Sequence, residues 1–182
     1  MLPNLTERLR DSILPITEAM VAILNRLQKL LKAASNGDSD RKPPDVVDIL
    51  NEDYQNLMRL AEQIRVHAER APYPYVAQRL HQISLEKQKN ASSLKEKIID
   101  LGGKPKDLRL DIHSGKNHWA RIVQDIKDQK ELENRFLDDA FRLALELPEI
   151  SDLLDKIVAG EVVHKETLQD LVARADPQAD QC

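Results

Sequence analysis

The chain has 182 residues, of which 32% are charged and only 3% aromatic. This composition is typical of a helical protein with solvated outer faces and argues against a β-sandwich. The net charge of −4 comes from interspersed acids and bases, which argues against nucleic-acid binding, and the single cysteine, Cys182, excludes an intramolecular disulfide and a cysteine-rich metal site.

The chain also lacks the sequence signals of secretion and of membrane insertion. Its first residues, MLPNLTERLRDS, carry charges early, so no signal peptide is expected. No apolar run approaches the roughly 18 residues that a spanning helix needs. We therefore expect a soluble cytoplasmic protein with neither a membrane nor a nucleic acid as its partner.

An apolar stripe in steps of three and four residues predicts a helix over residues 1–34. Pro15 interrupts the stripe, which indicates a kink there or a helix that begins at Pro15. Residues 35–44 are predicted to form a linker because they are rich in Ser, Asn, Gly, Asp and Pro. We expect this helix either to pack on the rest of the chain as a fifth helix, or to bind a second copy or another protein.

Four further helices are predicted in residues 45–173. Short connections join them as two hairpins, and a longer connection at 102–114 crosses between the hairpins. The expected fold is therefore all-α, an antiparallel four-helix bundle, followed by a disordered tail at 174–182. The predicted helices cover about 45–71, 75–101, 115–147 and 150–173.

Details of two helices are also predicted. The helix over 115–147 has Ser114 as its expected N-cap, and its apolar stripe predicts burial of Trp119, Val123 and Phe141. The helix over 75–101 ends at LGGKP (101–105), where glycine can take a left-handed conformation and proline prevents continuation.

An internal repeat links the two hairpins. The segments ISLEKQKNASSL (83–94) and IVAGEVVHKETL (157–168) align without a gap. In this register Lys87 faces Glu161 and Asn90 faces His164. Each of these residues completes the apolar stripe of its helix, so all four polar side chains are predicted to point into the bundle.

This pattern resembles the ferritin-like superfamily of di-iron carboxylate proteins, rubrerythrin-type members especially. In that family each hairpin carries an inward acid on its first helix and Glu-x-x-His on its second. The i, i+3 spacing presents both ligands on one helix face to iron or manganese. The phrase LGGKP also resembles the segment that ends the corresponding helix in the family. The resemblance covers roughly residues 45–173.

The sequence departs from the family at the first motif. Glu161 and His164 match the second motif, but Lys87 stands at the glutamate position of the first motif and Asn90 at its histidine position. A lysine ammonium has no lone pair for a metal and adds positive charge. We therefore expect the di-iron site to be lost and replaced by a polar and ionic core made of Lys87, Asn90, Gln129, Glu161 and His164.

Inward acids on the other two helices are less well defined by the sequence. On the first helix of the bundle the inward position is Asp53 or Tyr54. On the third helix Gln129, Lys130 and Glu133 occupy inward positions, with Asp128 beside that face. If a metal were bound, as iron or manganese, the ligands would come from Glu161, His164, Asp53, Asp128 and Glu133.

Two functions follow as hypotheses. The first is a non-catalytic bundle without a cofactor, acting as a structural or interaction module. The alternative is a metal-binding oxidoreductase or iron-handling protein with an incomplete site. Lys87 is expected to pair with Glu161, with Asp53 as a further candidate partner, or else to extend its ammonium to water at a wet bundle end. Family members commonly form dimers or larger assemblies, so the resemblance implies a homo-oligomer.

His67 and His113 are expected at helix ends or in solvent, without a chemical role.

Overall fold

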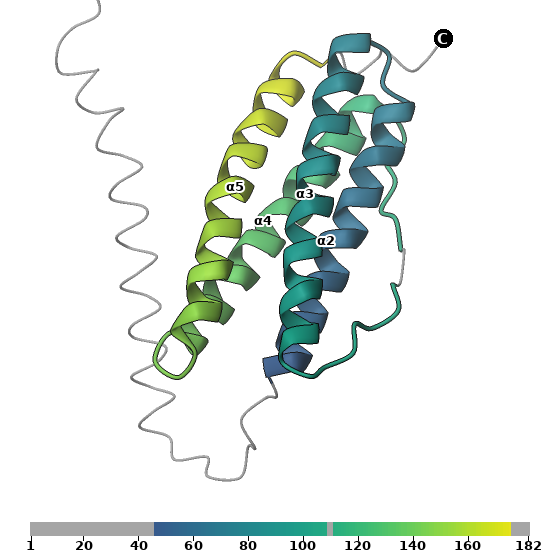
Figure 1. Cartoon of the computed structure of the whole chain (residues 1–182). Coiled ribbons are helices and arrows are strands. Elements are labelled where there is room, and N and C mark those ends of the chain that lie inside the picture. The colour runs from purple at the N-terminus through teal and green to yellow at the C-terminus, as the bar shows by residue number, and fades with distance from the viewer. Residues whose placement is uncertain (1–45, 109–110, 176–182) are drawn as a thin grey trace, which may run out of the picture. The chain divides into compact units, whose positions relative to one another are not determined.

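The computed structural model describes residues 46–108 and 111–175, which contain four α-helices and no strand (Figure 1). The predicted helix over 1–34, the linker and the tail beyond residue 175 lie outside the described residues. Within the part of the chain described, no helix combines the length and apolarity needed to cross a membrane. The helices are α2 (Val46–Glu69), α3 (Pro74–Asp100), α4 (His118–Leu143) and α5 (Pro148–Ala173).

The helices form an antiparallel bundle of two hairpins, α2–α3 and α4–α5, as Figure 1 shows. The connection from α3 to α4 runs along α2 to the opposite end of the bundle. The side chain of Asn51 holds the start of this connection through the carbonyl of Lys104 and the N–H of Lys106. Further along, the N–H of His113 donates to Gln63 at 2.9 Å. This crossover makes α2 pack antiparallel to α4, and α3 antiparallel to α5.

Local chemistry sets the helix ends. Gly102 has φ +77 after α3, and its N–H closes the last turn on Ile99 at 2.8 Å. α4 begins three residues later than predicted, because Asn117, and not Ser114, accepts from the N–H of Ala120 at 2.8 Å. α5 has Pro148 in its first turn, where a missing N–H costs nothing.

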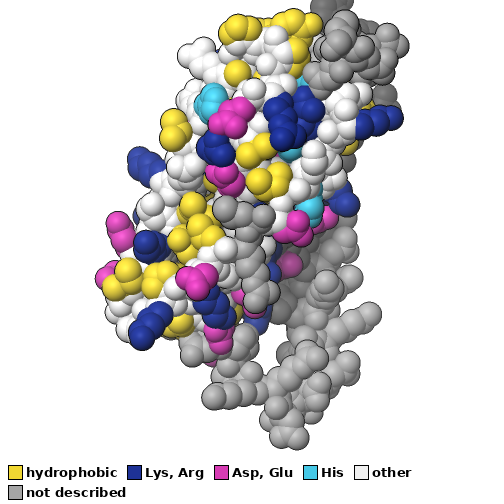
Figure 2. Space-filling view, turned by 90° about the vertical axis from the view of Figure 1, so that its right-hand side faces the viewer, with side chains coloured by type: hydrophobic (Ala, Val, Ile, Leu, Met, Phe, Trp, Pro, Cys, Tyr) yellow, Lys and Arg dark blue, Asp and Glu magenta, His cyan; other side chains and the backbone are white. Residues whose placement is uncertain are grey.

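The core is formed by the apolar stripes of all four helices, with Leu57, Leu94, Phe136 and Leu168 fully buried. The prediction that three apolar residues of α4 are buried was wrong. Their exposed fractions are 39% for Trp119, 38% for Val123 and 45% for Phe141. The regular spacing of apolar residues on α4 therefore combines a buried stripe with a second, exposed one. On the face of the bundle that Figure 2 shows, acidic and basic side chains are interspersed.

Candidate functional site: a buried ionic core

A lysine ammonium lies at the centre of the bundle. Lys87 on α3 is 0% exposed, and its Nζ forms an ion pair with the carboxylate of Glu161 on α5. The same Nζ donates to Oε1 of Gln129 on α4 at 2.5 Å. The alternative in which Lys87 extends to water is therefore wrong, because both of its partners are buried in the bundle.

Gln129 and Glu161 are also joined directly. The side-chain amide of Gln129 donates to the backbone carbonyl of Glu161 at 3.0 Å and to its Oε2 at 2.8 Å. Gln129 therefore bridges Lys87 and Glu161 and contacts both the backbone and the side chain of Glu161. Oε2 of Glu161 thus has two hydrogen-bond partners, whereas its Oε1 is buried without one among the described residues.

His164 extends this core toward the edge of the bundle. Its Nδ1 lies 3.5 Å from Oε2 of Glu161, and its Nε2 lies 2.7 Å from Oε2 of Glu86 on α3. Asn90 is half-buried and faces α5 at Gly160, where an added Cβ would lie 3.8 Å from its amide nitrogen. Glu86 is a partner that the sequence pattern did not suggest, since it lies one position off the inward stripe.

The α2 residue at the level of this core is identified by a hydrogen bond. Ser84 on α3 donates to the carbonyl of Ala61 at 2.8 Å. Lys87 lies about one turn further along α3, and because the helices are antiparallel, it faces α2 one turn earlier, at Leu57. Leu57 is fully buried. This places a leucine at this level of α2. Asp53 and Tyr54 are both buried, as expected of inward positions, and they lie about one turn away from Leu57.

The electrostatics favour the carboxylate form of Glu161. Burial raises the pKa of Glu161, but the Lys87 ammonium and His164 together lower it to about 2. Burial lowers the pKa of Lys87, while the Glu161 carboxylate acts in the opposite direction. Each charge is thus stabilised by the other in a site that water does not reach.

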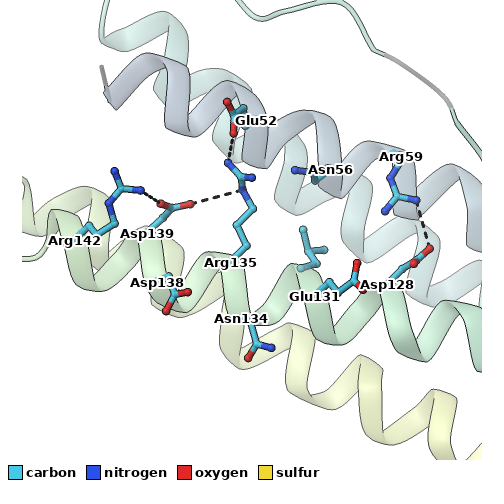
Figure 3. Close-up of a pocket in the computed structure, with 11 residues that line it drawn as sticks. Glu52, Asn56, Arg59, Asp128, Glu131, Asn134, Arg135, Asp138, Asp139 and Arg142 are labelled. Carbon is cyan, nitrogen blue, oxygen red and sulfur yellow. Dashed lines mark hydrogen bonds and ion pairs between the residues drawn. The ribbon is translucent and has the colours of Figure 1, made fainter. Parts of the chain in front are cut away.

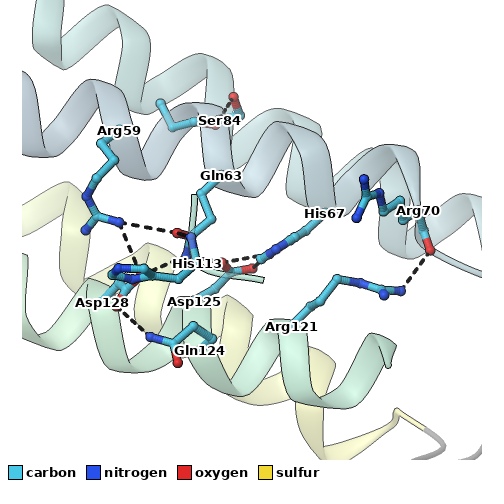
Figure 4. A network of polar contacts seen from close by, with 11 residues as sticks. Arg59, Gln63, His67, Arg70, Ser84, His113, Arg121, Gln124, Asp125 and Asp128 are labelled. Carbon is cyan, nitrogen blue, oxygen red and sulfur yellow. Dashed lines mark hydrogen bonds and ion pairs between the residues drawn. The ribbon is translucent and has the colours of Figure 1, made fainter. Parts of the chain in front are cut away.

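A second polar layer lies between α2 and α4, where Figure 4 shows its residues converging. Nδ1 of His67 lies 2.9 Å from both carboxylate oxygens of Asp125. The amide of Gln63 donates to Asp125 at 2.9 Å and to Asp128 at 2.8 Å. His113, in the connection, contacts Asp128 at 2.8 Å. His67 was expected at the surface or at a helix end. It lies in the last turn of α2, but it is not at the surface, because its side chain is 1% exposed.

This second layer has a structural role that follows from its contacts. Gln63 joins α2 to both acids of α4 and also accepts from the backbone of His113. The layer therefore anchors the crossover connection to the helices. Burial raises the pKa of Asp125, and hydrogen bonds from Gln63 and His113 hold the pKa of Asp128 below its usual value despite partial burial.

A third polar group lines a pocket of about 730 Å³ between α2 and α4, shown in Figure 3. Arg135 lies at its centre and pairs with Glu52, with Asp53 at 2.9 Å and with Asp139 at 3.7 Å. Arg142 contacts Asp139 at 3.0 Å from the other side. Arg135 and Arg142 are thus each paired with an acidic side chain that lines the same pocket.

The structure thus separates the candidate residues into different places. Lys87, Gln129, Glu161 and His164 lie together in the core. Asp53 lies with Arg135, and Asp128 lies in the second layer with Gln63 and His113. Glu133 pairs with Lys165 at 2.6 Å on the flank between α4 and α5, and Lys130 is exposed. None of these three acids has a contact with Glu161 among the described interactions.

Asp53→Asn is expected to stabilise the chain at about pH 8 by about 1–3 kcal/mol and to leave stability unchanged near pH 4. Burial, together with Asp139, raises the pKa of Asp53 from 3.8 to about 7. When the pKa of an acid is higher in the folded state than in the unfolded state, the folded protein loses stability as the pH rises from the unfolded-state pKa to above the folded-state pKa. Asparagine resembles the protonated, neutral acid, so the substitution removes this loss of stability. Melting temperatures at both pH values check this, and an unchanged pH slope would contradict it.

A family model of the ferritin-like domain matches residues 47–176. The chain belongs to the ferritin-like family. The match covers the four described helices and the crossover connection between the two hairpins, as expected for a ferritin-like bundle. A search of curated proteins gave no match. Among the described residues of this ferritin-like chain, no group of three or more His, Cys, Asp or Glu is arranged to hold a metal ion.

Proposed function

We propose that this ferritin-like chain is a non-catalytic scaffold in which an ion pair stands where the family carries its di-iron centre. One observation carries the proposal. The ammonium of Lys87 is fully buried between Glu161 and Gln129, at the position of the first glutamate ligand. The protein then acts as a structural or interaction module, and its polar core maintains the fold.

The residues present do not fit a pair of iron or manganese ions. Such a pair needs an acid on each first helix and a Glu-x-x-His set on each second helix. At the level of the core the donors on α2 and α4 are replaced by Leu57 and Gln129. On α3 both donors of the motif are replaced, by Lys87 and Asn90. Only Glu161 and His164, both on α5, match the family pattern.

The charge of Lys87 opposes a cation more strongly than a neutral replacement would. Two unit charges about 4 Å apart at an effective dielectric of about 20 repel by about 4 kcal/mol, and a divalent ion doubles this figure. Oε2 of Glu161 accepts from Lys87 and Gln129, whereas its Oε1 is buried without a hydrogen-bond partner among the described residues. A metal bound by this carboxylate would therefore lie beside the Lys87 ammonium.

The buried pair is better suited to a structural role than to a catalytic one. An ion pair of this kind contributes little net stability compared with apolar residues of the same shape. It does penalise every arrangement of α3, α4 and α5 in which Lys87 loses its partners, because an unpaired buried charge is costly. We propose that the network selects one register of the helices, which a scaffold requires.

Thermal unfolding with and without metal tests the proposal. We expect the same melting temperature in a chelator and in excess Mn²⁺ or anaerobic Fe²⁺. A site on the folded chain, saturated at about 100 times its Kd, would raise the melting temperature by about 5–10 °C. A rise of that size that disappears in His164→Ala would overturn the proposal and support the alternative, a metal-binding protein that uses Glu161 and His164.

A further inference from the structure

The pocket between α2 and α4 is separate from the ionic core of Lys87 and Glu161. Its volume of about 730 Å³ lies within the range of about 300–1,000 Å³ that small-molecule sites occupy. Figure 3 shows its charged side chains gathered at two ends. The first end consists of Asp128 and Glu131 with Arg59, and the second end consists of Glu52, Asp138 and Asp139 with Arg135 and Arg142.

The arginines of the pocket do not favour an anionic ligand. Each of them already forms an ion pair with an acid of the bundle. The pairs are Arg59 with Asp128 at 3.4 Å, Arg142 with Asp139 at 3.0 Å, and Arg135 with Glu52, Asp53 and Asp139. A phosphate or carboxylate ligand would have to displace one of these acids from a guanidinium, so the pocket is poorly suited to anions.

The acids of the pocket outnumber its arginines. Five acidic side chains and three arginines line it. At the first end Glu131 is exposed and has no ion pair among the described residues. The pocket therefore keeps a net negative charge, and a cation is the ligand that such a charge attracts.

Asp53 adds a buried acid behind the second end. Its side chain is 0% exposed, and its Oδ1 accepts from Nε of Arg135 at 2.9 Å. Its Oδ2 is buried without a hydrogen-bond partner among the described residues, although a buried polar atom normally has one. Burial and the nearby Asp139 raise the pKa of Asp53 to about 7. The second end therefore lacks a positive charge that a ligand ammonium would supply.

The spacing of the acids indicates the shape of the ligand. Glu131 and Asp138 are seven residues apart on α4, nearly two turns, so they lie on the same side of the helix about 10 Å apart along its axis. The apolar side chain of Leu132 lines the pocket between these two levels. A metal ion requires acids that converge on one point, whereas these acids lie at two separate ends. An elongated ligand with a positive charge at each end and an alkyl spacer matches this arrangement.

We propose that the pocket between α2 and α4 binds a small linear amine with at least two ammonium groups, that is, a diamine or a polyamine. One ammonium contacts Glu131 at the first end, and another contacts Asp138 and Asp139 at the second end. The alkyl spacer lies over Leu132. The pocket is distinct from the ionic core, so the proposal does not depend on whether the core binds metal.

Calorimetric titration of the full-length chain with two diamines of different length tests the proposal. At low ionic strength, diaminooctane with an amine at each end should bind saturably, with one molecule per chain. Diaminopropane should bind at least about tenfold more weakly, because it is too short to contact both ends and loses alkyl contact with Leu132. No binding of diaminooctane, or equal affinity for the two diamines, would overturn the proposal.

Single substitutions locate the site. Glu131→Gln and Asp138→Asn each remove one charge from one end, and both side chains are exposed, so the variants should fold, as circular dichroism would show. Each should weaken diaminooctane binding by about threefold to fivefold and reduce the preference for the longer diamine. Asp155→Asn is the matched control, because it changes the net charge equally at an exposed position on α5; its affinity should be unchanged. Equal weakening in Asp155→Asn would indicate general attraction by the acidic chain and would overturn the site.

Discussion

Lys87→Met is expected to lower the free energy of unfolding by about 3–5 kcal/mol at neutral pH. The substitution keeps the volume of the side chain but leaves Glu161, which is 0% exposed, without its ion-pair partner. Gln129 still donates to the carboxylate, but a single neutral donor does not replace an ammonium in a buried site. Chemical denaturation at neutral pH measures the loss.

A second substitution distinguishes the ion pair from simple packing. Lys87→Met with Glu161→Leu removes both charges, and we expect stability to return close to that of the unaltered chain or above it. Arg174→Met is a matched surface control, because Arg174 and Asp170 form an exposed pair, 66% and 57% exposed; its effect should stay within about 0.5 kcal/mol. An unchanged stability in Lys87→Met would contradict the proposed network.

Acid should remove the same contribution in the unaltered chain. The folded-state pKa of Glu161 is lowered from 4.5 to about 2, so the stabilisation by the pair is present above about pH 4.5. It is lost as the pH falls from about 4.5 toward 2, where the carboxylate binds a proton in both states. In Lys87→Met this part of the acid dependence should disappear, because the ammonium that lowers the pKa is gone.

The second large effect is a gain of metal binding in a variant with a completed ligand set. Leu57→Glu, Lys87→Glu, Asn90→His and Gln129→Glu together would place an acid on α2 and α4 and a Glu-x-x-His set on α3, opposite Glu161 and His164. We expect this variant to bind about two iron or manganese ions per chain, as the family pattern requires. Titration with Fe²⁺ under anaerobic conditions measures the stoichiometry.

The completed variant also offers an internal control. Without metal it holds several carboxylates in one buried site, so its apo form should be less stable than the unaltered chain and should recover stability when metal is added. Adding Glu161→Gln and His164→Ala to the same variant should abolish both the binding and the recovery. A folded variant with no metal binding would show that Leu57 was wrongly assigned to the level of the core.

The sequence predicted the fold through patterns that depend only on residue spacing. Apolar stripes indicated the four helices, and the repeat between residues 83–94 and 157–168 placed Lys87 opposite Glu161 without any knowledge of packing. An apolar stripe indicates which side of a helix is buried, but it does not indicate the axial position of one helix relative to its neighbour. Asp53 is buried on the correct side of α2, yet about one turn away from the core.

The second polar layer could not be found from the sequence for a related reason. His113 reaches Asp128 only because the crossover connection runs along α2, and the course of an irregular segment is not encoded in a periodic pattern. His67 was assigned to the surface or to a helix end, and it does lie in the last turn of α2. It is buried because Asp125 of α4, far away in sequence, accepts its hydrogen bond. The position of Asp125 one turn before Gln129 on α4 was the available signal.

We propose that the ion pair of Lys87 and Glu161 takes the place of the metal centre. Elemental analysis tests it most directly, on the unaltered chain purified without a chelator and again after anaerobic incubation with Fe²⁺ and removal of free metal. The proposal predicts no stoichiometric metal in either sample. About two tightly held ions per chain would contradict it, and one ion lost in Glu161→Gln would show that half of the family site still binds metal.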